Sequence, residues 1–96
     1  MQILGLGIIH DFKNKHSDAR GQIESWYYEV KEANWQTPTD IKKRFASASF
    51  LSDKIVIFNI KGNSYRLEVK VSFQRKKVII LWAGTHAEYD KRNKSR

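Results

Sequence analysis

Three side chains that can transfer protons lie in the segment GTHAEYDK, residues 84–91, directly after an apolar run. Thr85 and Glu88 have the spacing of a capping box, so a short helical turn can begin here, and Gly84 provides a flexible joint between strand and turn. The residues that this structural role leaves unexplained are His86, Tyr89 and Asp90. An imidazole titrates near pH ~6.5, which suits a histidine to general acid or base chemistry.

The chain carries a large excess of positive charge. It has 18 Lys and Arg against 10 Asp and Glu, which gives a formal net charge of +8 and an isoelectric point near 9.9. On so small a body this charge creates a positive field that favours phosphate-rich or strongly acidic partners. A basic protein with no nucleic-acid role is the alternative that charge by itself leaves open.

The composition favours neither a metal site nor a membrane segment. The chain has no cysteine, and its three histidines, at positions 10, 16 and 86, fall in different expected elements without a carboxylate cluster beside them. We therefore expect no metal and no cofactor. No apolar stretch approaches the ~18 residues of a membrane span, and the N-terminal MQILGLGII lacks the basic region and cleavage site of a signal peptide. The expected compartment is the cytoplasm, with no membrane association.

The first half of the chain is expected to be mainly helical. Ser17 can cap a helix whose apolar residues recur at spacings of three and four as far as Ala33. In TPTD, Thr37 is the expected cap, Pro38 occupies the first helical position and Asp40 lies near the positive helix end. The expected elements are a strand at 2–6, helices at 8–15, 17–33 and 37–45, and a loop at 46–53.

The second half changes to a period of two, which predicts strands. IVIFNI (55–60) and the alternating SYRLEVKVSF (64–73) are joined by a hairpin turn at KGN (61–63). A turn at 74–77 leads into VIILW (78–82), expected to be a strand buried on both faces. The predicted fold is α+β: a single domain, residues 1–96, with the N-terminal strand and the helices packed on one face of an antiparallel β-meander. The other, polar face carries Arg66 and Lys70, with Lys61 at the nearby turn.

Three segments together resemble the HigB toxins of bacterial type II toxin–antitoxin systems. They are WYYEVKEANWQTPTDIKKRF, IVIFNIKGNSYRLEVKV and ILWAGTHAEYDK, and the likeness extends from about His10 to Lys91. The resemblance implies a compact domain of the RelE/ParE fold group that acts as an mRNA interferase on messages at the translating ribosome. It also implies neutralisation by HigA, a helix-turn-helix antitoxin, with operator DNA contacted only through the toxin–antitoxin complex.

Carried to matching positions, the resemblance and the chemistry of RNA cleavage predict a site. Attack of a ribose 2′-hydroxyl on its own phosphate needs a base, an acid and positive charge on the phosphorane, but no metal. We assign His86 as acid or base, Arg66 to transition-state stabilisation, Tyr89 as proton donor or stacking group, and Asp90 as orienting group or base. The residues expected to contact phosphate or RNA are Asn63, Lys61, Lys70 and Lys91. Tyr65, by strict alternation, should face the core and lie outside the site.

Two other functions fit the same pattern. A ParE-like toxin of the same fold would inhibit DNA gyrase and cut no RNA, because fold does not determine function. A noncatalytic RNA-binding module would use the same charge, although the chain has no RNP motif. The combination of His86, Tyr89 and Arg66 favours the nuclease.

Overall fold

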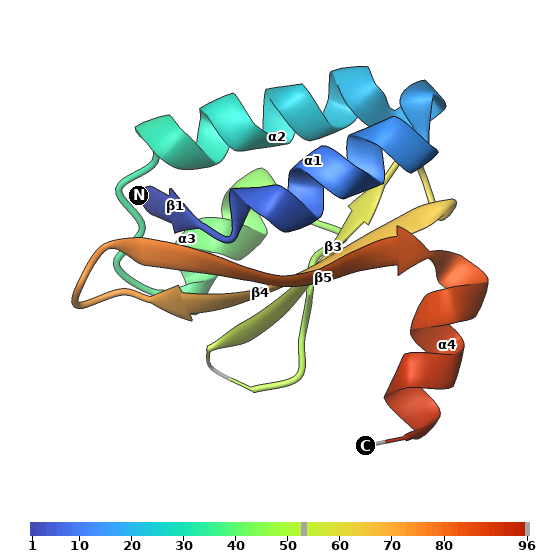
Figure 1. Ribbon diagram of the computed structural model, residues 1–96. Helices are drawn as coiled ribbons and strands as arrows, with labels where there is room; N and C mark the ends of the chain where they lie inside the picture. The colour runs from blue at the N-terminus through green and yellow to red at the C-terminus, as the bar shows by residue number, and fades with distance from the viewer. Residues whose placement is uncertain (53, 96) are drawn as a thin grey trace.

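A five-stranded mixed sheet forms the centre of the computed structural model, which describes residues 1–52 and 54–95 (Figure 1). The elements are β1 (Gln2–Leu4), α1 (Leu6–Lys15), a 3₁₀ turn η1 (Ser17–Ala19), α2 (Arg20–Glu32), α3 (Pro38–Arg44), β2 (Ser49–Phe50), β3 (Ile55–Ile60), β4 (Tyr65–Ser72), β5 (Lys77–Thr85) and α4 (His86–Lys94). The strand order is β1-β5-β4-β3-β2, with β1 parallel to β5 and the other pairs antiparallel. The predicted α+β class is confirmed.

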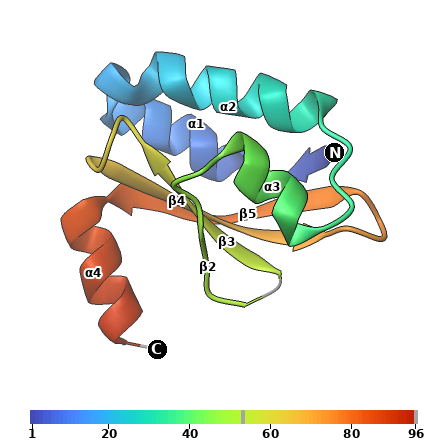
Figure 2. The same ribbon diagram turned by 180° about the vertical axis from the view of Figure 1, so that it is seen from behind.

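The helices are divided between the two faces of the sheet. Figures 1 and 2 show α1, α2 and α3 on one side and α4 on the other. The core lies under the first three helices, where Phe12, Trp26 and Ile41 are buried among strand residues such as Phe58 and Leu67. Each such side chain contributes about 1.5–3 kcal/mol through burial. The face opposite this core, which we call the outer face, is where α4 packs.

Local signals in the sequence account for most of the element boundaries. In TPTD, the Asp40 carboxylate accepts hydrogen bonds from the backbone N–H groups of Gln36 (2.8 Å) and Thr37 (3.2 Å) at the start of α3. These bonds lower the pKa of Asp40, the one from Gln36 most. At the junction of β1 and α1, Gly5 adopts φ +86°, and a Cβ there would approach the carbonyl oxygen of Ile80 to 2.7 Å. Only glycine fits this turn without strain.

Three local predictions were wrong. Ser17 does not cap a helix: it is the first residue of the 3₁₀ turn, and α2 begins at Arg20 with no side-chain cap. The expected loop at 46–53 contains the two-residue strand β2, which pairs with β3, while Asp53 lies outside the described residues. VIILW is not buried on both faces, because the Leu81 side chain is 37% exposed.

The exposure of Leu81 follows from a β-bulge. Glu68 pairs with Trp82 and Val69 pairs with Ile80, so Leu81 has no partner on β4. The extra residue places Leu81 and Trp82 on the same side of β5, whereas alternation would have separated them. Alternation along β4 is unaffected, so that strand keeps its polar residues on the outer face as predicted.

Candidate active site

The capping box of the opening segment starts a full helix. The backbone N–H of Thr85 donates to Glu88 Oε1 (2.8 Å), and the backbone N–H of Glu88 donates to Thr85 Oγ1 (3.1 Å). The bond from the Thr85 backbone holds the pKa of Glu88 below its usual value. The predicted capping box is confirmed, and the short turn expected from it is the nine-residue helix α4. His86 is therefore its first residue, with Tyr89 and Asp90 one turn further on.

The pairing of β4 with β5 brings Arg66 to the start of this helix. Arg66 is opposite Gly84, and Tyr65 is opposite Thr85. Past the end of the ladder, the backbone N–H of His86 donates to the Ser64 carbonyl (3.0 Å). From the strand rise and the spacing of paired residues, the Cα atoms of Arg66 and His86 are about 8 Å apart. Both side chains are long enough to contact one phosphodiester group over that distance.

The side chain of Arg66 is directed along the strand toward the hairpin turn. Its Nη1 donates to the backbone carbonyl of Asn63 (3.3 Å), a residue whose side chain is exposed. The turn lies at the same end of the sheet as the start of α4, because β4 begins where β5 ends. Asn63, Arg66 and His86 are therefore brought together at one end of the β4–β5 pair.

His86 and Asp90 form a pair on the exposed surface of α4. His86 Nε2 lies 3.2 Å from Asp90 Oδ2, and the two side chains are 50% and 54% exposed. A carboxylate this close to one ring nitrogen can orient the imidazole. The other ring nitrogen, Nδ1, is not part of this contact. The arrangement resembles the base and orienting group of many acid–base sites.

Two residues that sequence analysis missed hold α4 against the sheet. Arg92 Nε and Nη2 donate to the two carboxylate oxygens of Glu68 (3.3 and 3.4 Å), and its guanidinium lies 5.6 Å from the centre of the Trp82 ring. Glu68 is only 3% exposed, although it lies on the polar face of β4. Tyr89 packs beside Trp82, with ring centroids 6.0 Å apart. One acidic residue among the basic residues of that face was the only sequence signal for this contact.

Gly84 has a different role from the one predicted. It is a paired residue inside β5 and is buried, so it is not a flexible joint. A Cβ at this position would lie 2.7 Å from the Trp82 ring and 2.9 Å from Glu88 Oε1. Glycine is required here because the indole and the helix cap both pack against its backbone.

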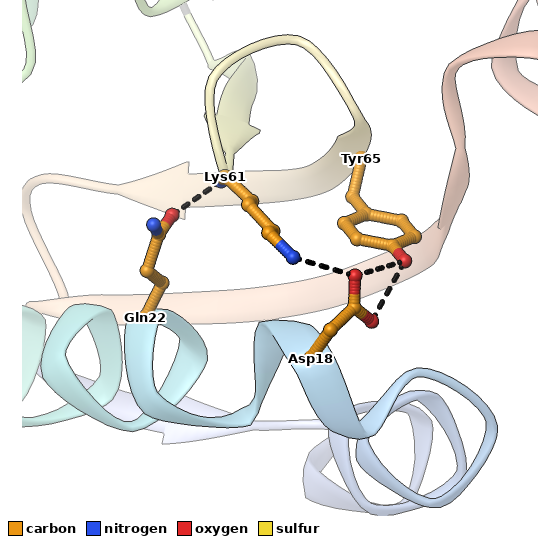
Figure 3. A network of polar contacts seen from close by, with 4 residues as sticks. All are labelled: Asp18, Gln22, Lys61 and Tyr65. Atoms are coloured by element: carbon orange, nitrogen blue, oxygen red, sulfur yellow. Dashed lines mark hydrogen bonds and ion pairs between the residues drawn. The ribbon is translucent and has the colours of Figure 1, made fainter.

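Lys61 lies on the opposite side of the hairpin turn from Arg66. Figure 3 shows its ammonium group bonded to Asp18 (2.9 Å), whose carboxylate also accepts from the Tyr65 hydroxyl at 2.8 and 2.9 Å. The side-chain oxygen of Gln22 accepts from the backbone N–H of Lys61. Lys61 and Tyr65 lower the pKa of Asp18, and Asp18 raises the pKa of both partners. This cluster fastens the turn to the beginning of α2.

The remaining predicted residues are separated from this centre or lie at its border. Tyr65 faces the helices and packs against Phe12 and His16, with ring centroids 5.3 and 4.8 Å away. Lys70 is exposed on the same face of β4 as Arg66, about 13 Å along the strand. Lys91 is exposed on α4 directly after Asp90.

Neither a metal-binding cluster nor a membrane-spanning helix is present among the described residues. No group of three or more His, Cys, Asp or Glu side chains within residues 1–52 and 54–95 is arranged to hold a metal ion. In the same part of the chain, no helix has the length and apolar character needed to cross a bilayer.

The sequence itself matches a known toxin family. Residues 19–92 match the HigB toxin family, the RelE-like toxic component of a toxin–antitoxin system. The chain belongs to this family. The mRNA interferase HigB of Escherichia coli O6:H1 (strain CFT073) is 24% identical over 93 residues, which cover 95% of this chain and 90% of that protein. The predicted resemblance to the HigB toxins is confirmed.

The matched range contains every residue of the candidate site. It begins before α2 and ends at Arg92, so it includes β4, β5 and the anchored part of α4. All of β1 and all of α1 lie outside it. The family match therefore covers the part of the HigB-family toxin that positions Arg66 and His86.

Proposed function

We propose that this HigB-family toxin is an endoribonuclease that cleaves mRNA at the translating ribosome. The observation that carries the proposal is the nearness of two backbone positions, Arg66 on β4 and His86 at the start of α4. Arg66 is paired with Gly84, and His86 begins α4 two residues later, its backbone bonded to the hairpin turn. The family match and the relative named as an mRNA interferase support the same activity.

The proposed reaction is an internal transfer on the RNA backbone. The ribose 2′-oxygen attacks the adjacent phosphorus, and the bond from phosphorus to the 5′-oxygen breaks. His86 takes the 2′-hydroxyl proton through Nδ1, while Asp90 holds the imidazole through Nε2. Tyr89 donates a proton to the leaving 5′-oxygen. The products are a 2′,3′-cyclic phosphate and a 5′-hydroxyl end, so no proton is gained or lost overall.

Arg66 stabilises the charge that develops between these steps. A guanidinium presents paired donors to two phosphate oxygens and keeps its charge at any physiological pH. Its present contact is a single bond of 3.3 Å to a backbone carbonyl, which a phosphate can replace. A positively charged donor at a phosphorane is worth at least about 10²-fold in rate.

The proposed partners follow from the family. A toxin of a toxin–antitoxin system has an antitoxin, and we propose a HigA-type helix-turn-helix protein that also carries the complex to operator DNA. The net charge of +8 fits binding to ribosomal and messenger RNA. The proposed place of action is the cytoplasm, where translation occurs.

His86→Ala and Arg66→Ala test the proposal. Each variant should reduce mRNA cleavage by at least about 10²-fold with little effect on folding, because each removes a group used mainly in the transition state. Cleavage is measured on message bound to translating ribosomes, and circular dichroism checks the fold. His10→Ala and Arg20→Ala are matched controls, since both residues are exposed and lie on the helical side.

The result that would overturn the proposal is equally specific. If the two site variants cut message at the wild-type rate, the site lies elsewhere. If the wild-type toxin arrests growth with intact message and broken chromosomal DNA, it inhibits gyrase and is not a nuclease.

A further inference from the structure

A second surface on the outer face has the chemistry of a phosphate-binding site. A groove of about 550 Å³ lies at the end of the sheet away from α4. Its lining includes Lys54, Lys70, Arg75 and Lys77, with no acidic residue among the described residues, and we call it the basic groove. Figure 1 shows that the β4–β5 turn, which forms part of it, lies at the opposite end of the sheet from α4.

The four cations of the basic groove come from two segments of the chain, the β4–β5 hairpin and the residue before β3. Lys70 extends from β4, Lys77 begins β5 and Arg75 lies in the turn between these strands. Lys54 precedes β3 and is held close because its carbonyl accepts a 2.7 Å hydrogen bond from the backbone N–H of Val71. Within residues 1–52 and 54–95, none of the four forms an ion pair. Four close positive charges repel one another, and a polyanion relieves that repulsion.

Two other pockets formed by the described residues differ from the basic groove in charge. The pocket between α1 and α2 contains Lys13, but Glu24 pairs with it at 3.7 Å. The pocket beside the start of α4 is lined by Asp11 and Glu88 as well as by cations. In both, carboxylates offset the positive charge, which would oppose binding of an RNA strand.

The basic groove also has an apolar wall. Leu4 and Ile79 line it, and Leu4 is 38% exposed at the edge of the sheet. Positive charge along a groove follows the backbone of single-stranded nucleic acid without sequence preference. A free phosphate ion would use the cations only, whereas a strand also covers the apolar wall with its sugars and bases.

The distance between the basic groove and the candidate site indicates which part of an RNA strand the groove would bind. Lys70 and Arg66 lie on the same strand and the same face, about 13 Å apart, with Glu68 between them in contact with Arg92 of α4. A few nucleotides of single-stranded RNA cover this distance by passing beside that contact. We propose that the basic groove binds the sugar–phosphate backbone of the RNA strand next to the scissile bond. This rests on the proposed endoribonuclease function.

A matched pair of double variants tests the groove. Lys70→Gln with Arg75→Gln removes two charges from it, and Lys31→Gln with Arg20→Gln removes one lysine and one arginine from the exposed surface of α2. Both double variants are made with His86→Ala, so that the probe stays intact. The probe is a fluorescently labelled, unstructured RNA oligonucleotide, and its dissociation constant is measured over a range of salt concentrations.

The affinity of the groove variant for the RNA oligonucleotide is expected to depend less steeply on salt concentration. Each phosphate contact contributes about 0.7 to the slope of log K against log salt, so losing two contacts lowers the slope by about 1.4. If the groove variant and the protein without the groove substitutions bind RNA equally at 1 M salt, this slope change corresponds to a loss of RNA affinity on the order of 50-fold at about 50 mM salt. The control variant has the same net charge as the groove variant, and its loss of RNA affinity should be several-fold smaller.

Equal losses of RNA affinity in the two double variants would overturn the proposal, because the groove residues would then contribute only through the net charge of the protein. Unchanged RNA affinity together with weakened antitoxin binding would make it a protein interface. The groove and the nuclease can fail separately. If the groove variant without His86→Ala binds and cuts RNA as the wild type does, only the groove proposal fails. If wild-type toxin binds RNA through the groove and never cuts it, only the proposed reaction fails.

Discussion

Arg92→Ala is the most informative perturbation of the site. It changes how firmly α4 is held against the sheet, and it removes none of the proposed catalytic side chains. Arg92 joins the helix to the sheet through Glu68 and through the face of Trp82. Removing it leaves the Glu68 carboxylate, which is 3% exposed, without this cation. The helix that carries His86 and Asp90 should then detach from the outer face more often.

The size of the effect follows from burial. Removing one partner of a fully buried ion pair costs about 3–5 kcal/mol. The Arg92 side chain is 37% exposed and its bonds of 3.3 and 3.4 Å are long for charged groups, so water screens part of the interaction. We expect about 1–3 kcal/mol, which raises the detached fraction of α4 by roughly 5- to 150-fold. The rate of RNA cleavage should fall in proportion to the fraction of time that α4 is detached in the variant.

Two assays follow this change. Amide hydrogen exchange of residues 88–94 reports the opening of α4, and denaturant unfolding reports global stability. Lys94→Ala is the control, since Lys94 is an exposed cation on the same helix. Glu68→Gln should weaken the effect of Arg92→Ala, because a neutral amide has less need of a cation. The reasoning is refuted if Arg92→Ala exchanges its α4 amides as slowly as the wild type, or if Lys94→Ala has an equal effect.

Two further predictions concern the supports of the site. Gly84→Ala should lower the free energy of unfolding by about 1–3 kcal/mol and reduce cleavage, since its Cβ would meet the Trp82 ring at 2.7 Å. An unfolding midpoint and cleavage rate equal to those of the wild type would contradict this. Lys61 and Tyr65 lower the pKa of Asp18 in the folded protein. The ionised carboxylate therefore stabilises the fold at pH values above the pKa of Asp18 in the unfolded chain, which is about 4. This stabilisation is lost as the pH falls through the lower pKa of the folded protein. Asp18→Asn should therefore unfold more easily than the wild type at pH 7, with the difference disappearing in acid; a difference independent of pH would show that charge is not the cause.

Most of the fold was predictable because its signals are local. The alternation of residues 64–73, the proline at the start of α3 and the capping box at Thr85 depend on neighbours within four positions. The pairing of the hairpin with the last strand also followed from the order of strands. For that reason the sequence indicated correctly that Arg66 and the start of the final helix would lie at one end of the sheet.

What sequence analysis missed depends on contacts between distant residues. Alternation predicted the polar face of β4, but not that α4 covers its centre through a contact between residues 24 positions apart. Lys61 was expected to contact RNA, and the structure pairs it with Asp18, 43 positions away. No periodicity records such contacts, since either partner taken separately is an ordinary surface residue.

The amino-acid sequence therefore determined which chemical groups are available and in which elements they lie. Tertiary structure decided which of them share a surface. The bulge at Leu81 places Trp82 beneath α4, and the Glu68–Arg92 contact sets where His86 and Asp90 are held. The physical reason is that a side chain's type sets its charge and hydrogen-bonding capacity, whereas its partners depend on how strands and helices far apart in the chain pack together.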